Sequence, residues 1–278
     1  MFIGIHHVAV VVRSVEKALG FYRDVLGLPV TQEALVADQG VKAALLSVGD
    51  DEIELLEPTN PAGGVARFLE KKGEGIHHLC IETSDVAGAL MRAKAAGLPL
   101  IDQAPRQGLA GTIGFLHPGA NHGVLVELAQ PGGGRDRPHH PAMNSIGATG
   151  IEAFFVGAKD PAAMADAFAG NFNAKSNPSE QDPHFLAQRI VVEVGKNRVA
   201  IFNSADLAAS PDVSGLLGGR VEGLFGLCLT VTDFNAALRH FGERKVPLEV
   251  RQNTAAAPIA RVASDRAYGV NLFLRPVV

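Results

Sequence analysis

The sequence predicts an α+β fold made of four copies of one β-α-β-β-β unit, with two copies in each half of the chain. A Gly-Ile-His-His segment at residues 4–7 returns at residues 75–78, and each copy opens an apolar, strand-like run that leads into a helical pattern. The second half then repeats glycines of the first at an offset of 146 residues, as from Gly4 to Gly150. Recurrence of this kind indicates repeated copies of one supersecondary structure that pack together in layers.

The first unit starts with a strand over residues 1–12. Ser14 is a suitable N-cap for the helix that follows, in which apolar residues recur at helical spacing as far as Leu26, and Gly27 ends that helix. Three extended runs and a short helix complete the unit. They are expected at residues 29–33, 41–48, 52–57 and 64–72.

The second unit repeats this order and leads to the second half of the chain. A strand is expected at residues 76–83 and a helix at residues 85–96, followed by a glycine stop and three further extended runs. Residues 132–147 are rich in proline, glycine and charge, and are therefore predicted to be a linker. This linker divides the chain into a first domain at residues 1–131 and its copy at residues 148–278.

Composition excludes several functional classes. The chain has 278 residues, of which 47% are hydrophobic and 19% charged, and this is enough apolar material to build the cores of two domains. The formal net charge of −4 gives no basic field for a nucleic acid, and no apolar run reaches the length of a membrane span. Both cysteines lie in strand patterns, which excludes a disulfide framework. A cytoplasmic protein without a nucleic-acid or membrane partner is therefore expected.

Four residues at matched positions in the first half indicate a metal site. Neighbouring side chains of a strand point to opposite faces, so only one histidine of each pair can face a shared cavity. We assign His7 and His78 to that face and the preceding histidine of each pair to the other. Glu54 and Glu127 each lie in the apolar strand that closes their unit, where an isolated carboxylate is costly to bury without a partner or a metal. Together the four residues predict a site with two imidazole and two carboxylate ligands.

The second half acts as an internal control for this prediction. A single histidine or glutamate in a strand is more often structural than metal-binding, so each residue taken alone says little. At the four equivalent positions, however, the second half has lost every candidate ligand while it keeps the glycines and the apolar pattern. The residues found there are Ala153, Ala200, Gly226 and Phe273. Joint loss indicates that the four ligands serve one purpose, which the second half has abandoned.

The ligand types suggest a reaction. Two imidazoles and two carboxylates without a thiolate favour a borderline or hard divalent ion over a closed structural zinc site, and we predict one such ion per chain, with Co, Ni, Zn, Mn and Fe as the candidates. Four protein ligands in an octahedral site leave two positions for water or for a substrate carbonyl oxygen, which suits stabilisation of an enolate. A ligating glutamate can also take the α-proton. Glu127 and Glu54 are therefore the candidate catalytic residues for proton abstraction next to a carbonyl.

The first half resembles the vicinal oxygen chelate superfamily (glyoxalases, bleomycin resistance proteins and extradiol dioxygenases), and within it the methylmalonyl-CoA epimerases. The segments that carry this resemblance cover residues 5–130; they are HHVAVVV, FYRDVLGL, EIELLEP, FLEKKGEGIHHLCIE and FLHPGANHGVLVEL. The resemblance implies metal ligands at His7, Glu54, His78 and Glu127, with Glu127 as an acid/base beside the metal. It also implies two tandem glyoxalase-like domains, each a cupped, mixed eight-stranded sheet, the second without metal ligands.

One position departs from the epimerase pattern. Some epimerases carry a second catalytic glutamate where this chain has Ala43. Glu54 or another group would then have to act on the opposite face of the substrate.

The function that these observations favour is a metal-dependent epimerase that abstracts an α-proton next to the thioester carbonyl of an acyl-CoA. Three alternatives stay open: a glyoxalase I-type lactoylglutathione lyase, an extradiol-type dioxygenase, and a non-catalytic resistance-type protein that binds a small molecule. We expect a monomer or a homodimer, in which the second half of the chain acts as a built-in partner that covers the first.

Overall fold

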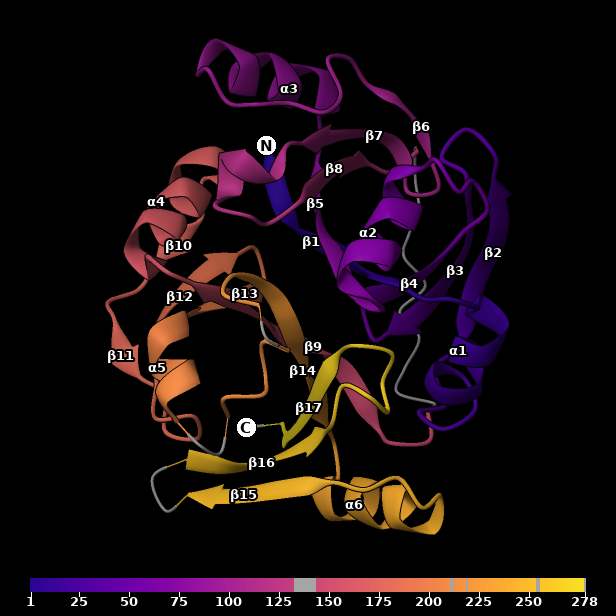
Figure 1. Cartoon of the computed structure of the whole chain (residues 1–278), viewed down its shortest axis with the longest axis vertical. Helices are drawn as coiled ribbons and strands as arrows, with labels where there is room; N and C mark the ends of the chain where they lie inside the picture. The colour runs from indigo at the N-terminus through magenta and orange to yellow at the C-terminus, as the bar shows by residue number, and fades with distance from the viewer. Residues whose placement is uncertain (133–143, 211–212, 219, 254–255, 278) are drawn as a thin grey trace. The chain divides into compact units, whose positions relative to one another are not determined.

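The computed structural model describes residues 1–132, 144–210, 213–218, 220–253 and 256–277, and its strands form two mixed sheets (Figure 1). The sheet of the first half has the order β2-β3-β4-β1-β5-β8-β7-β6, and that of the second half has the order β10-β12-β13-β9-β14-β17-β16-β15. The two orders are the same when strands are matched by their place in the repeat. The predicted α+β fold, with four β-α-β-β-β units in two cupped sheets, is therefore confirmed. Residues 133–143, most of the predicted linker, lie outside the described residues.

The first half follows the predicted order of strands and helices. Its strands are β1 (Phe2–Val11), β2 (Val30–Val36), β3 (Val41–Val48), β4 (Asp51–Pro58), β5 (Gly75–Thr83), β6 (Arg106–Gly108), β7 (Gly111–Leu116) and β8 (Val126–Gln130). Its helices are α1 (Val15–Tyr22), α2 (Gly64–Lys72), α3 (Val86–Ala95) and the 3-10 helix η1 (Pro118–Asn121).

The second half differs from the first mainly at the place of β2, which two short strands share, so that its sheet has nine strands instead of the predicted eight. Its strands are β9 (Ala148–Ala158), β10 (Lys175–Ser176), β11 (Glu180–Gln181), β12 (Gln188–Val194), β13 (Asn197–Asn203), β14 (Gly223–Val231), β15 (Glu249–Asn253), β16 (Ala256–Val262) and β17 (Asn271–Pro276). Its helices are α4 (Pro161–Phe172), α5 (Ser204–Ala209) and α6 (Phe234–Glu243). Among the described residues, no helix combines the length and the apolar character that crossing a membrane requires.

Helix α1 ends four residues earlier than predicted, at Tyr22. It begins as expected, because the side chain of Ser14 accepts a hydrogen bond from the backbone N–H of Lys17. Beyond Tyr22 the chain continues in wider turns, in which the backbone N–H of Leu26 donates to the carbonyl of Phe21 at 2.9 Å. Leu26 stays fully buried, and this explains why the apolar spacing extends beyond the helix itself.

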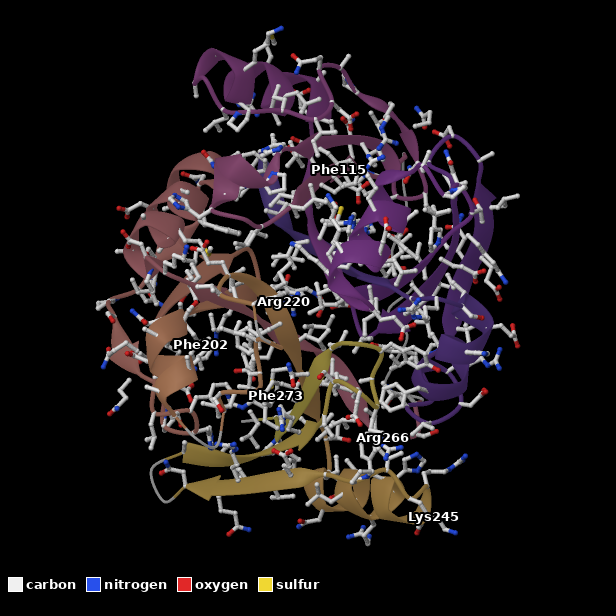
Figure 2. The ribbon with its side chains drawn as sticks, viewed as in Figure 1. Phe115, Phe202, Arg220, Lys245, Arg266 and Phe273 are labelled. Atoms are coloured by element: carbon white, nitrogen blue, oxygen red, sulfur yellow. The ribbon has the colours of Figure 1, made fainter. Side chains whose placement is uncertain are left out.

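The second half fills the place of the predicted ligands with apolar side chains. Gly226 stands at the position equivalent to His78, and a β-carbon added to it would lie 2.6 Å from the carbonyl oxygen of Asn271 and 3.2 Å from the ring of Phe273. Phe273, which stands at the position of Glu127, is itself buried and is labelled in Figure 2. Its ring therefore takes the space that a side chain at position 226 would need.

The Cα positions divide the chain into two compact units, and each unit draws residues from both sequence halves. In their described parts, the first unit contains Met1–Val8, His78–Asp136 and Phe154–Leu224, and the second contains Ala9–His77, Arg137–Ala153 and Phe225–Val278. The domain limits 1–131 and 148–278, which follow the sequence repeat, stay a prediction.

Each unit contains a buried hydrogen bond between the two sequence halves, and the two bonds use equivalent residues. In the first unit, the backbone N–H of Ile5 donates to the side-chain oxygen of Asn197 at 3.3 Å. In the second unit, the N–H of Ile151 donates to a carboxylate oxygen of Asp51 at 2.8 Å. Ile151 and Asn197 follow Ile5 and Asp51 by the repeat offset of 146 residues. Reciprocal contacts of this kind are typical of two-fold symmetric dimer interfaces.

Two of the repeated glycines owe their position to the same contacts. Gly49 and Gly195 are equivalent in the repeat, and both have a φ of +62°, in the left-handed region that favours glycine. A β-carbon at Gly49 would also collide with the carbonyl of Thr149, and one at Gly195 would collide with the carbonyl of Ile3. The retained glycines thus allow one half to approach the backbone of the other.

Candidate metal centre

The predicted ligands of the second β-α-β-β-β repeat, His78 and Glu127, lie on strands that are buried on both faces. In β8, Glu127 stands between Val126 and Leu128, which are both buried. Strand β8 pairs in parallel with β5, and the register sets Glu127 beside Cys80. His78 precedes Cys80 by two residues on β5, and residues two apart on a strand share a face. The register therefore brings His78 and Glu127 to the same face of the sheet.

Two imidazoles converge on one oxygen of Glu127. The Nε2 atoms of His7 and His78 each lie 3.2 Å from Glu127 Oε2, and the two ring centroids are 5.6 Å apart. Their exposed fractions are 2% for His7, 3% for His78 and 5% for Glu127. The strand alternation that selected His7 and His78 is thus consistent with the geometry.

Glu54, the fourth predicted ligand, is also buried. It lies on β4, the strand next to β1 in the sheet, and is 7% exposed. Among the four sequence-predicted site residues, the structure thus brings His7, His78 and Glu127 together, and the place of Glu54 in the site stays a prediction.

The charge of Glu127 is favoured by its two histidine neighbours. Burial alone would raise the pKa of this carboxyl, because desolvation penalises the charged form. Hydrogen bonds from the rings of His7 and His78, together with their charge, overcome this effect and hold the pKa well below its ordinary range. Glu127 is therefore a carboxylate at neutral pH.

These side chains fit a divalent cation. Two atoms bound to one ion in adjacent octahedral positions, each about 2.1 Å away, lie about 3 Å apart, close to the 3.2 Å between Glu127 Oε2 and each imidazole. Buried carboxylates require positive charge or hydrogen-bond donors. Imidazole nitrogens and carboxylate oxygens are ligands that borderline divalent metals accept. The donor set is therefore suited to one divalent metal ion.

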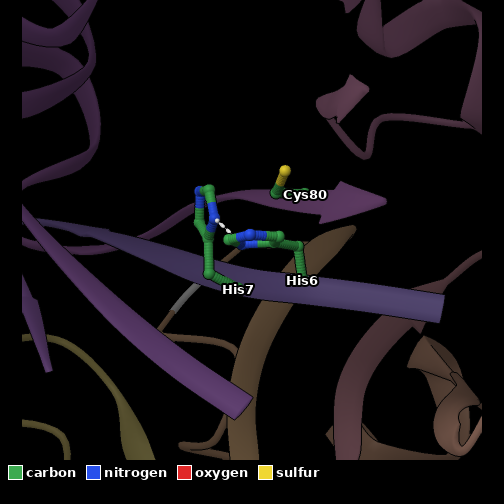
Figure 3. A group of neighbouring side chains, drawn as sticks. All are labelled: His6, His7 and Cys80. Carbon is green, nitrogen blue, oxygen red and sulfur yellow. Dashed lines mark hydrogen bonds between the residues drawn. The ribbon is translucent and has the colours of Figure 1, made fainter. Parts of the chain in front are cut away.

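The sequence analysis placed His6 on the opposite face from His7, but its ring lies beside that of His7. The two Nδ1 atoms are 3.0 Å apart, and Figure 3 shows this contact near Cys80. The contact leaves His7 Nε2 directed toward Glu127, which is the usual way in which a neighbouring group orients a ligating histidine. His77, by contrast, packs edge to face on Phe68 of α2, with ring centroids 4.9 Å apart.

Cys80 adjoins the centre, although the sequence analysis noted it only as a cysteine in a strand pattern. Its sulfur, His6 and His7 form a second group of ligand-type atoms within 4.8 Å of one another. Burial raises the pKa of the Cys80 thiol to about 12, so the sulfur is a protonated thiol at neutral pH. Its spacing of two residues from His78 is the signal that places it on the same face.

Phe115 is the other neighbour that sequence reasoning missed. It lies on β7, where the antiparallel register sets it opposite Glu127. Its ring packs edge to face on that of His78, with centroids 5.2 Å apart and an interplanar angle of 87°; Figure 2 labels this residue. Phe115 therefore forms part of the wall of the site and orients the His78 ring.

Comparison with known proteins relates the first half to a described superfamily and to several of its members. A family model described as the glyoxalase/bleomycin resistance protein/dioxygenase superfamily matches residues 6–116. The mitochondrial methylmalonyl-CoA epimerase of Mus musculus is 38% identical over 128 residues, which cover 45% of this chain and 72% of that protein. The ethylmalonyl-CoA/methylmalonyl-CoA epimerase of Cereibacter sphaeroides is 38% identical over 129 residues, covering 45% of this chain and 96% of that protein.

A structural likeness extends over both halves. A triple mutant of 4-hydroxymandelate synthase from Streptomyces coelicolor matches 99% of this chain and 93% of its own, with a TM-score of 0.71 and 18% identity. At this identity the likeness concerns the fold, since one fold serves many activities. The matched segments, the repeated units and the sheet order together show that the chain belongs to the glyoxalase/bleomycin resistance protein/dioxygenase superfamily.

Proposed function

We propose that the protein is a metal-dependent epimerase that removes and returns the α-proton of an acyl-CoA thioester, as methylmalonyl-CoA epimerases do. The observation that carries this proposal is the convergence of His7 and His78 on one buried oxygen of Glu127. The 38% identity of the same half to epimerases from Mus musculus and Cereibacter sphaeroides supports it.

His7, Glu54, His78 and Glu127 would hold the ion. When bound, a divalent metal stabilises negative charge on a carbonyl oxygen and so makes the neighbouring C–H group more acidic. The second half carries no equivalent ligand residues, because Gly226 and Phe273 stand at the positions of His78 and Glu127. One ion per chain is therefore proposed.

Glu127 is the proposed base. Its lowered pKa makes it a carboxylate at neutral pH, and a carboxylate within reach of the α-carbon can accept the proton there. The neighbouring Cys80 is a protonated thiol, so it does not compete as a base.

Epimerisation also needs a group that returns a proton to the opposite face of the α-carbon, and Glu54 is the proposed one. Ala43, where some epimerases have a glutamate, is a buried alanine on β3 and cannot carry a proton. Strand β4 pairs with β3 so that Glu54 faces Leu45, two residues from Ala43. Glu54 therefore lies on the same face of the sheet as Ala43, beside a residue two positions further along β3.

Deuterium exchange tests this function. Metal-loaded protein should wash solvent deuterium into the α-position of both epimers of methylmalonyl-CoA. In the epimer whose α-proton faces Glu127, Glu127→Gln should lower the exchange by about 100-fold or more, the usual contribution of a general base, because an amide cannot accept the proton. Glu33→Gln, at an exposed site on β2, is the matched control and should exchange normally.

The variant Glu54→Gln tests which residue transfers the proton at each face of the α-carbon. If Glu54 serves the second face, this variant should exchange deuterium into one epimer while converting little of it to the other. Absence of α-proton exchange in any acyl-CoA by the wild-type protein with its metal restored would sink the epimerase proposal. Turnover of a hemithioacetal in its place would then favour the glyoxalase I-type lyase.

A further inference from the structure

A guanidinium group stands next to the candidate metal centre. Arg106 lies on the edge strand β6, and its central carbon is 5.5 Å from the centroid of the Phe115 ring, in cation–π contact. Phe115 in turn packs on His78 at 5.2 Å. These two distances add to an upper limit of 10.7 Å between the guanidinium carbon and the His78 ring.

Asp102 binds the Nε atom of this guanidinium and not its two terminal nitrogens. Arg106 Nε lies 3.3 Å and 3.2 Å from the two carboxylate oxygens of Asp102, and the backbone N–H of Phe115 donates to the same carboxylate at 3.0 Å. One acid therefore positions both the arginine and the aromatic ring under it. Within the described part of the chain, the two terminal nitrogens of Arg106 make no hydrogen bond.

Arg23 shows the ordinary arrangement for comparison. It donates to Asp24 through both Nε and a terminal nitrogen, at 2.7 Å and 3.0 Å. The carboxylate of Asp24 therefore engages one terminal nitrogen of Arg23, whereas that of Asp102 engages none on Arg106. The Arg106 side chain is 35% exposed and Phe115 is half-buried, so neither side chain is enclosed in the core. The planar fork that remains open on Arg106 matches a carboxylate, which can accept two parallel hydrogen bonds.

We propose that Arg106 selects acyl thioesters whose acyl group carries a free carboxylate, by pairing its terminal nitrogens with that carboxylate. This inference rests on the proposed function, because it takes the acyl group to lie at the metal centre. A carboxylate attached to the α-carbon is only a few bonds from the thioester carbonyl. It is therefore the substrate anion nearest to the metal centre, and Arg106 is a cation whose guanidinium carbon lies at most 10.7 Å from the His78 ring. The phosphates of coenzyme A are the other anionic groups of such a substrate, and they lie at the far end of the long pantetheine arm.

A pair of ligands isolates the carboxylate. Malonyl-CoA and acetyl-CoA share the thioester and all phosphates, and differ by the carboxylate alone. Calorimetry on the metal-loaded protein should show that the wild type prefers malonyl-CoA, and that Arg106→Gln loses about 10- to 100-fold in affinity for it while its affinity for acetyl-CoA is unchanged. Arg106→Lys should retain part of the preference, because it keeps the charge and loses the fork. Arg23→Gln, the matched control, should behave as wild type.

Other results would overturn the inference. Equal weakening of both ligands in Arg106→Gln would mean that Arg106 binds a phosphate or supports the fold, and an unchanged preference would mean that it binds neither. Malonyl-pantetheine, which has no nucleotide phosphates, should show the same loss in Arg106→Gln if the carboxylate is the partner. Because these are binding measurements, they judge Arg106 even if the exchange assay refutes the epimerase proposal.

Discussion

Glu127 keeps its charge in a place where burial opposes it, and this residue makes the stability of the protein depend on pH. Its pKa in the folded state lies below the ordinary value of 4.5, whereas in the unfolded chain it returns to that value. A lowered folded-state pKa contributes stability that is fully present above the unfolded pKa, and that is lost as the pH falls through the folded-state pKa. The window therefore lies on the acid side of pH 4.5.

Melting temperatures of the metal-free protein test this contribution of Glu127 to stability. Glu127→Gln should unfold at a lower temperature than wild type at pH 7, because the amide gains less from the rings of His7 and His78. The gap between the two melting temperatures should narrow as the pH falls from 7 to about 3, because below pH 4.5 the unfolded wild-type chain binds a proton that the folded carboxylate does not. Glu33→Gln, at an exposed site, should show no such convergence. A gap that is the same at both pH values would contradict the assignment.

Site residues divide into those that the sequence could reveal and those that it could not. His7, Glu54, His78 and Glu127 could be proposed as candidates from the sequence, because each occupies a matched position in a repeat and strand alternation chooses the histidine. Phe115 was not predictable, because its contact with His78 depends on the register between β7 and β8, and pairing across strands has no local sequence signature.

At the level of elements, repeated glycines are needed where the backbone of one half passes close to that of the other. Gly49 combines a positive φ with a carbonyl, that of Thr149, in the space that a side chain would need. Gly97 also has a positive φ, of +73°, but has no atom within 4 Å of such a β-carbon. Comparison of Gly49 with Gly97 therefore separates the cost of a positive φ from the cost of a clash with a neighbouring backbone.

Alanine at each position should therefore cost different amounts. Gly97→Ala should lower the free energy of unfolding by about 1–2 kcal/mol, for left-handed strain alone. Gly49→Ala should lose about 1–3 kcal/mol more, because the turn or Thr149 has to shift. Urea unfolding of both variants measures the difference, and equal losses would show that the approach of the two backbones is looser than described.

The elements themselves were predictable where the period of apolar residues was clear. The limits of α1 were not, because Leu26 is as buried beyond the helix as it would be within it. The chain reaches this position through a wide turn, in which the N–H of Leu26 bonds to the carbonyl of Phe21, five residues back. Periodicity records burial, and here burial continues where helical hydrogen bonding does not.

For the whole molecule, the two sequence halves are joined by reciprocal hydrogen bonds within the two units. The repeat predicted that both halves would share one fold, and the common strand order agrees. It did not predict which residues meet, because Asp51 and Asn197 look like ordinary turn residues in sequence. Their role depends on a partner about a hundred or more residues away, Ile151 for one and Ile5 for the other.

These bonds can be tested by removal of one acceptor. Asp51 is 4% exposed and accepts from the backbone N–H of Ile151. Asp51→Ala should lower the free energy of unfolding by about 1–3 kcal/mol, because a buried donor then lacks its acceptor. Asp50→Ala, at the exposed neighbouring position, should change stability by less than about 0.5 kcal/mol. Similar losses for both variants in chemical denaturation would argue against a specific role for this contact.

The packing of Phe273 over Gly226 makes a return of metal ligands to the second half difficult. A histidine at position 226 would meet the carbonyl of Asn271 and the ring of Phe273 before it could approach a metal. A glutamate at position 273 alone would bury a carboxylate with no imidazole beside it. Neither substitution is useful without the other, so no path of single beneficial changes leads back to a second centre. The second half is thus free to diverge in every respect except the surfaces with which it supports the first.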